Sequence, residues 1–158
     1  MASVTTIGGT PDGSDCRIAI VASRFNEFFV KRLLDGCLST LEAAGLDAGA
    51  ITVVWVPGAF EIPLVAKALA LAGKPDAVIA LGAIIRGETA HFEYVAGECA
   101  RGVAAVGLET GIPVIFGVLT VDDSRHALER SGDDENNKGS DAARAALETI
   151  SVLRQIPV

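Results

Sequence analysis

The chain has 158 residues, half of them hydrophobic and 21% charged, with a net charge of −7 at pH 7. It has no cluster of lysine and arginine, which excludes the usual nucleic-acid binders, and no apolar run long enough to span a membrane. The first residues lack the basic and apolar regions of a secretory signal, so we expect a loose polar arm at 1–15 within a single domain at 1–158.

The cysteines are odd in number and widely spaced, at Cys16, Cys37 and Cys99. No C-x-x-C pair indicates zinc or redox chemistry, so we expect small buried hydrophobes in a reduced, cytoplasmic protein without a metal. The hydrophobic share is high for so short a chain. It indicates apolar surface that is buried between the subunits of a homo-oligomer.

Strand-like apolar runs alternate along the chain with segments of helical spacing. The run at 76–85 is almost continuously apolar, which is typical of a parallel strand covered on both faces. Four strand–helix units predict an α/β fold with an open, mainly four-stranded parallel sheet between two layers of helices. The strands are expected at 17–23, 51–56, 76–85 and 113–119, and the helices at 26–44, 61–72, 89–109, 122–130 and about 138–153.

Glycines indicate where two of these helices end and how a third one packs. Gly45 and Gly73 follow the last apolar positions of their segments, as glycine commonly does at helix ends. The segment 89–109 is rich in Gly and Ala, which permits close approach by another part of the chain.

Polar and aromatic residues follow each predicted strand. In a parallel sheet the carboxyl ends of the strands meet at one edge, where ligands bind. The sequence therefore predicts a shared site at that edge, built from residues 23–26, 57–61, 86–91 and 120–123.

Three of these residues suit a flat, polar ring. Phe25 and Phe60 could be core aromatics or could stack on a ligand. Glu61 could simply favour the dipole at a helix start, or could accept hydrogen bonds from hydroxyl and N–H groups. Together they predict a pocket for such a ring.

The third strand is followed by a candidate anion site. Gly87–Thr89 opens a predicted helix, where free N–H groups and the Thr89 hydroxyl suit an anion, although Thr89 could serve only as a helix cap. His91 could carry protons beside it, or could be an ordinary surface residue. With Glu93 and Cys99 it does not match an established zinc spacing.

Two cations near the C-terminus could balance the charge of an anion. Arg130 ends a predicted helix, where the dipole favours it in any case, whereas Lys138 opens one, where the dipole opposes it. The stretch GDDENNKGS around Lys138 departs from the P-loop pattern and follows no strand, so it does not indicate nucleotide triphosphate binding.

From about Arg17 to the C-terminus the sequence resembles the lumazine synthase family. Any one of the matching segments alone would be weak, but six in register along one short chain are strongly specific. They are SRFN (23–26), VPGAFEIP (56–63), GAIIRGETAHFEYV (82–95), PVIFGVLT (113–120), LER (128–130) and NKGSDAA (137–143).

This resemblance implies a flavodoxin-like three-layer sandwich and a transferase activity. The reaction condenses 5-amino-6-(D-ribitylamino)uracil with 3,4-dihydroxy-2-butanone 4-phosphate to 6,7-dimethyl-8-ribityllumazine, phosphate and water, the penultimate step of riboflavin biosynthesis. No cofactor and no metal are implied. The alternatives within the same fold are a non-catalytic lumazine or flavin carrier and a shell protein.

The resemblance also implies the roles of individual residues. His91 and Arg130 would be catalytic, His91 by moving protons and Arg130 by pairing with the butanone phosphate, with Lys138 nearby. The phosphate would also bind Glu88 and Thr89, and Phe116 would complete the pocket from a neighbouring subunit. The pyrimidine and its ribityl chain would contact Phe25, Ala59, Phe60, Glu61, Ala83, Ile84 and Ile85.

The implied assembly is a homopentamer with active sites between neighbouring subunits. Some members of the family pack twelve pentamers into an icosahedral shell. Asn136 stands where shell formers usually carry glycine, and the sequence leaves ring and shell open. An association with riboflavin synthase is also left open.

Overall fold

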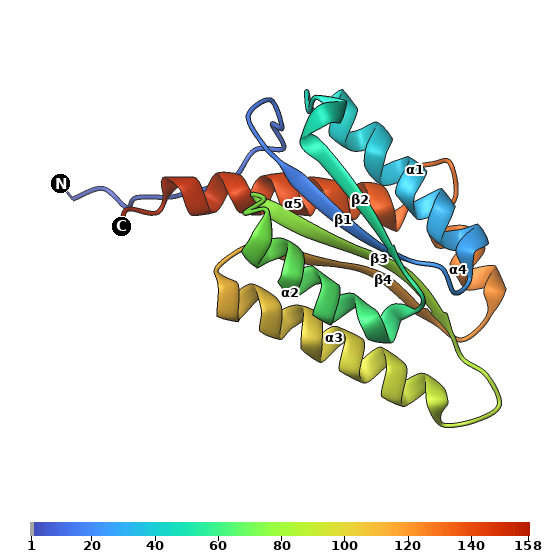
Figure 1. Cartoon of the computed structure of the whole chain (residues 1–158). Coiled ribbons are helices and arrows are strands. Elements are labelled where there is room, and N and C mark those ends of the chain that lie inside the picture. Colours follow the sequence, from blue (N-terminus) through green and yellow to red (C-terminus); the bar gives the residue numbers. More distant parts are fainter. Residues whose placement is uncertain (1) are drawn as a thin grey trace.

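A computed structural model describes residues 2–158 and contains one sheet of four strands. The strand order is β2-β1-β3-β4, and all three neighbouring pairs run parallel. In Figure 1 the four arrows point to the same side, and both chain termini lie at the opposite side. The strands are β1 (Ile18–Ser23), β2 (Ile51–Val56), β3 (Ala77–Ile85) and β4 (Val114–Val121).

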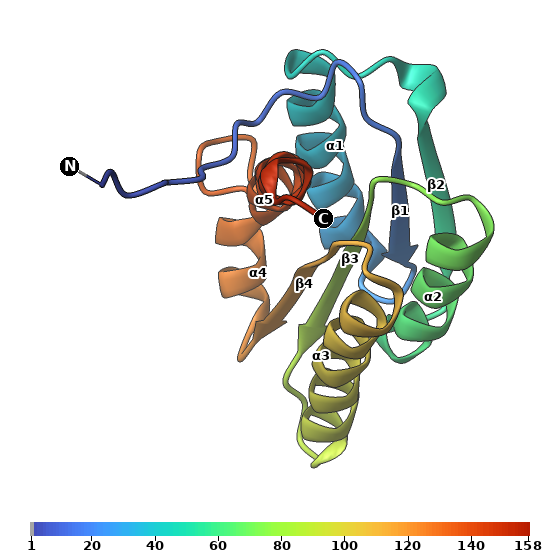
Figure 2. The same ribbon diagram turned by 90° about the vertical axis from the view of Figure 1, so that its left-hand side faces the viewer.

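Helices cover both faces of this sheet (Figures 1 and 2). Helices α1, α4 and α5 lie on one face and α2 and α3 on the other. The prediction of a three-layer α/β sandwich around a parallel sheet is therefore confirmed. The helices are α1 (Glu27–Ala43), α2 (Ile62–Ala72), α3 (His91–Thr110), α4 (Ser124–Arg130) and α5 (Lys138–Gln155), with 3₁₀ turns η1 (Ala48–Ala50) and η2 (Ala59–Glu61).

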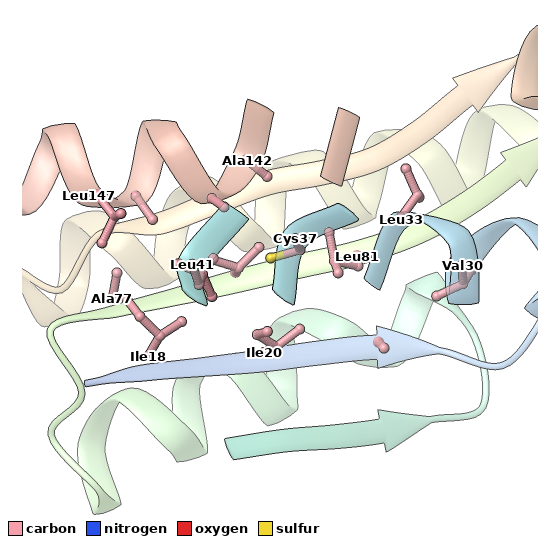
Figure 3. Packing of buried hydrophobic residues seen from close by; sticks show 14 of the residues in the cluster. Ile18, Ile20, Val30, Leu33, Cys37, Leu41, Ala77, Leu81, Ala142 and Leu147 are labelled. Carbon is pink, nitrogen blue, oxygen red and sulfur yellow. The ribbon is translucent and has the colours of Figure 1, made fainter. Parts of the chain in front are cut away.

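The two central strands hold the layers together because both of their faces are buried. All six residues of β1 are buried, and alternate side chains point to opposite faces. Ile18 and Ile20 pack against α1 and α5 (Figure 3), whereas Ala19 and Val21 pack towards α2 and α3. Each fully buried isoleucine stabilises the fold by about 1.5–3 kcal/mol relative to an exposed one.

The cysteines behave as small core residues, as predicted. All three are buried and free. Burial raises the pKa of the Cys37 thiol to about 12 and that of the Cys99 thiol to about 11. Both thiols are therefore protonated, and poor nucleophiles, at neutral pH. None of the helices within residues 2–158 is long and apolar enough to cross a bilayer.

Glycines end two helices and allow one pair of helices to pack closely, as the sequence indicated. Gly45 follows α1 with a φ of 98°, and Gly73 is the C-cap of α2. A Cβ at Gly102 of α3 would lie 2.5 Å from Cγ of Pro63 in α2, so this glycine permits the close packing of the two helices. A Cβ at Gly97, in contrast, would meet nothing within 4 Å.

The helix predicted at 89–109 begins two residues later than expected, at His91. Residues 88 and 89 form a bend, and Ala90 takes the N-cap position without a side-chain hydrogen bond. The Thr89 hydroxyl accepts a long hydrogen bond, 3.4 Å, from the backbone N–H of His91. The prediction that Thr89 lies inside the helix is therefore wrong. The chain first turns away from the end of β3, and the helix begins only after this turn.

The predicted arm at 1–15 contains no strand or helix in its described part, residues 2–15. It runs beside α5, where Nε2 of Gln155 donates to the Gly8 carbonyl at 2.7 Å. The backbone N–H of Thr10 donates to the Ser151 hydroxyl at 3.2 Å. Met1 lies outside the described residues.

The closest helix contact depends on Gly139, and this gives a test of the fold. A Cβ at Gly139 would lie 1.9 Å from the backbone oxygen of Leu33 in α1. We expect Gly139→Ala to lower the free energy of unfolding by about 1–3 kcal/mol, because α5 must move away from α1. Urea unfolding at one protein concentration, followed by the fluorescence of Trp55, measures the loss.

The matched control is Gly73→Ala, at a position with a φ of −89° where the nearest atom to a new Cβ is 3.7 Å away. This change should alter the free energy of unfolding by no more than about 0.5 kcal/mol. Equal unfolding free energies for the two variants would contradict the packing described here.

Candidate active site

The loops that follow β1 and β2 are joined by backbone hydrogen bonds at the carboxyl edge of the sheet. The strands end side by side, with Ser23 paired with Val56. Beyond them, the N–H of Arg24 donates to the carbonyl of Val56 at 2.8 Å, and the N–H of Phe25 donates to that of Pro57 at 3.0 Å. Phe25 is thereby held beside the turn that contains η2.

Asn26 joins the same loop to β3. Its backbone is left-handed, with a φ of 60° and a ψ of 40°, and its Nδ2 donates to the carbonyl of Ala83 at 2.8 Å. Asparagine adopts this conformation more readily than most residues. We predicted that this helix begins at residue 26, but Asn26 is the N-cap of α1. The side chain of Asn26 instead joins the end of β1 to β3.

These ties enclose one side of a cavity of about 710 Å³ at the carboxyl edge. Its other walls are η2, the end of β3 and the first turns of α3. Most of the residues predicted for ring and anion binding meet there. They are Phe25, Ala59, Phe60, Glu61, Ala83, Ile84, Ile85, Thr89 and His91.

Phe25 and Phe60 present aromatic surface instead of filling the core. Their exposed fractions are 73% and 60%. The reading of either residue as a core aromatic is therefore wrong for this chain. Exposed rings on the wall of a cavity offer faces on which a planar ligand can stack.

Glu61 brings a carboxylate to the same wall. It ends η2 and takes the N-cap position of α2, but its side chain accepts no hydrogen bond from that helix. The side chain is exposed, and its Oε2 lies 3.5 Å from the position that a Cβ on Gly58 would take. The carboxylate is thus positioned by the turn and can accept hydrogen bonds from a ligand.

The opposite wall carries the candidate anion site. Gly87 and Thr89 line the cavity directly before α3, and His91 is the first residue of that helix. The N-terminal N–H groups of a helix favour negative charge, and the side chain of His91 is exposed beside them. Glu88, between the two lining residues, is exposed and does not line the cavity.

Three predicted site residues lie away from this cavity in the single chain. Phe116 is on the edge strand β4 and is 41% exposed. Arg130 ends α4, where its Nη1 donates to the carbonyl of His126 at 3.1 Å. Lys138 begins α5 and its Nζ is 2.9 Å from Oδ2 of Asp141.

Several wall residues were not singled out from the sequence. Phe92 and Val95 follow His91 in α3, and their spacing from one another, three residues, places them on one helix face. This signal was available in GAIIRGETAHFEYV. The remaining one is Tyr94, whereas Asn26, Pro57, Gly58 and Gly87 lie in the segments predicted to build the site.

No group of three or more His, Cys, Asp or Glu side chains within residues 2–158 is arranged to hold a metal ion. The cavity wall instead offers rings, one carboxylate, one imidazole and backbone groups. Such a set can bind a planar heterocycle at one end and an anion at the other.

Comparison with known proteins agrees with this arrangement. The family model for 6,7-dimethyl-8-ribityllumazine synthase matches residues 15–154. The 6,7-dimethyl-8-ribityllumazine synthase of Desulfovibrio desulfuricans is 49% identical over 156 residues, covering 99% of this chain and 100% of that protein. The chain therefore belongs to the 6,7-dimethyl-8-ribityllumazine synthase family.

Proposed function

We propose that this enzyme condenses 5-amino-6-(D-ribitylamino)uracil with 3,4-dihydroxy-2-butanone 4-phosphate. The products are 6,7-dimethyl-8-ribityllumazine, phosphate and water, in the penultimate step of riboflavin biosynthesis. The reaction is a transferase reaction. Membership of the family supports this proposal, since the relative that is 49% identical bears the name of this synthase.

The observation that carries the proposal is that two opposite sides of the cavity present different chemical groups. Exposed aromatic rings and the Glu61 carboxylate stand on one side, and the N-terminus of α3 with His91 stands on the other. A ring substrate and a phosphate-bearing substrate would thus be held next to each other.

The pyrimidine would occupy the side formed by the first three strand ends. Phe25 would stack on the ring, and Ala59, Phe60 and Glu61 would hold the ring and the ribityl chain. Backbone groups of residues 83–85 would bind the polar edge of the ring. The strand pairing supports this, because residues 83–85 pair with β4 alone, while the pairing of β3 with β1 ends at Leu81 and leaves the other side of this stretch outside the sheet.

The butanone phosphate would lie at the start of α3. Backbone N–H groups at Glu88 and Thr89, with the Thr89 hydroxyl, would bind the phosphate. His91 would move protons as the amine attacks the ketone, the imine forms, phosphate is eliminated and the ring closes. The helix N-terminus would stabilise the departing dianion.

Much of the rate acceleration would come from holding the two substrates together. Amines and ketones condense without strong catalysts, so correct placement removes the largest part of the barrier. The proposed reaction is redox-neutral and consumes no nucleotide, so it needs neither a redox cofactor nor a nucleotide.

Neighbouring subunits would complete each site. The wall residues of the cavity include no lysine or arginine, whereas the phosphate of the substrate calls for one. The half-buried Arg130 and the exposed Lys138 and Phe116 lie elsewhere on the chain and would reach the cavity of an adjacent copy in a homopentamer. Exposed Leu64 and Leu108 on α2 and α3 support such an assembly.

A fluorescence assay with the two purified substrates tests the proposed reaction. Wild-type protein should form lumazine well above the uncatalysed background. The variant His91→Ala should be slower by about tenfold to a hundredfold, because one proton-transfer group is lost while substrate placement remains. Background rate alone, with tight binding of lumazine or flavin, would instead identify a carrier.

The role of Arg130 predicts a selective loss of phosphate binding. In Arg130→Ala, the KM for the butanone phosphate should rise by about tenfold to a hundredfold, while the KM for the pyrimidine stays near that of the wild type. Arg125→Ala, which removes an exposed arginine of the same helix, is the matched control. Equal effects of the two variants would contradict a direct contact between Arg130 and phosphate.

Light scattering of the purified protein tests the assembly. We expect the mass of a pentamer or of a shell of twelve pentamers, because each site would need residues from a neighbour. A monomer with full activity would contradict shared sites. A shell, as opposed to a ring, would show that the turn before Lys138 tolerates Asn136 in place of glycine.

A further inference from the structure

Arg86 has no part in the chemistry proposed above, yet it stands at the junction of the two walls. It follows the last residue of β3, and its backbone N–H donates to the carbonyl of Val121 at 2.9 Å. This bond continues the pairing of β3 with β4 beyond the strands. The guanidinium therefore leaves the sheet at its carboxyl edge, between the loops that follow these two strands.

The guanidinium contacts three side chains from two other segments. Its Nε donates to Oδ1 of Asp122 at 3.0 Å, and its Nη1 donates to Oε1 of Glu93. Its Cζ lies 4.4 Å from the centroid of the Phe92 ring. Arg86 thus joins the turn after β4 to the first turn of α3.

That first turn has few other polar attachments, although Phe92 also packs against the core cluster between the sheet and helices α2 and α3. Its N-cap, Ala90, offers no side-chain hydrogen bond, and the bond from His91 to Thr89 is long. A Cβ at Gly87 would meet nothing within 4 Å, so no other group packs against this point of the loop that leads to the helix.

The geometry requires an arginine. A planar guanidinium can donate to two carboxylates and lie over an aromatic face at the same time, whereas an ammonium cannot reproduce this arrangement. The side chain of Arg86 is 44% exposed, and exposed ion pairs add little to the stability of a fold. What the contacts can do is fix the position of Phe92, a wall residue of the cavity, and of its neighbour His91.

We propose that Arg86 is a positioning residue, which holds the first turn of α3, with His91 and Phe92, against the turn after β4. The proposal rests on the proposed function. The hydrogen bond from Arg86 also keeps the pKa of the Glu93 carboxyl below its usual value, so this partner is charged at neutral pH.

Steady-state kinetics of Arg86→Met, Glu93→Gln and Asp122→Asn separate positioning from charge. If Arg86 only attracted the phosphate, its loss would raise the KM for the butanone phosphate, and loss of either acid would lower it. Positioning requires all three variants to change in the same direction. We expect the KM for the butanone phosphate to rise by about tenfold in Arg86→Met, and by less in Glu93→Gln and Asp122→Asn.

The double variant Arg86→Met with Glu93→Gln should be no worse than Arg86→Met alone, because both changes break the same contact. Additive losses, or changes of opposite sign in the arginine and acid variants, would overturn the proposal.

The matched control is Arg154→Met. Nη2 of Arg154 is 3.2 Å from Oδ1 of Asp76 and donates to the carbonyl of Asp15 at 3.0 Å, at the opposite edge of the sheet. This variant removes an arginine of similar exposure and should leave both KM values unchanged. A raised KM here would show that loss of any such arginine is enough, and would overturn a specific role for Arg86.

Amide hydrogen exchange at 88–94 provides a readout without substrate. Exchange should be faster than in the wild type in all three variants and unchanged in Arg154→Met. If the wild type forms no lumazine while exchange changes as expected, the proposed function fails and the contact made by Arg86 stands. If the wild type is active and the variants change neither kinetics nor exchange, the proposal for Arg86 fails alone.

Discussion

The candidate site depends on the parallel pairing of four strands. Parallel pairing places the carboxyl ends of β1, β2, β3 and β4 at one edge, and so brings together loops that are far apart in the sequence. The pairing does not stop where the strands end, because the backbone N–H of Phe25 still donates to the carbonyl of Pro57 after β2, and that of Arg86 to the carbonyl of Val121 at the end of β4. A rigid, doubly covered sheet can therefore position side chains on loops that make few contacts of their own.

The side chains of these loops divide the site into two halves with different chemistry. One half offers exposed rings and a carboxylate, and the other offers a helix N-terminus and an imidazole. Exposing Phe25 and Phe60 has an unfavourable free energy in water, so their exposure in the single chain indicates surfaces that are covered by a ligand or a neighbouring subunit. The proposed assembly would account for the high hydrophobic share of the sequence in the same way.

Most of the fold could be predicted from hydrophobic periodicity and from helix-end residues. The bounds of β2 were predicted to the residue, and Gly45 and Gly73 end their helices as expected. The start of α3 could not be predicted, because Thr89 satisfies the same local pattern as a cap whether the helix begins there or two residues later. The hydrogen bond from Asn26 to the carbonyl of Ala83 could not be predicted either, since it joins residues that only the folded sheet brings together. Arg130 ends α4 and does not line the cavity of its own chain, so its predicted role depends on the proposed assembly.

A crystal structure with bound 5-amino-6-(D-ribitylamino)uracil tests the central claim most directly. The account predicts the pyrimidine ring stacked on Phe25, with its polar edge on the backbone of residues 83–85 and its ribityl chain near Glu61. A second cavity of about 640 Å³ lies between α1 and α5, with Arg32 and Arg144 in its lining. A pyrimidine found there, with the carboxyl edge of the sheet empty, would contradict the account.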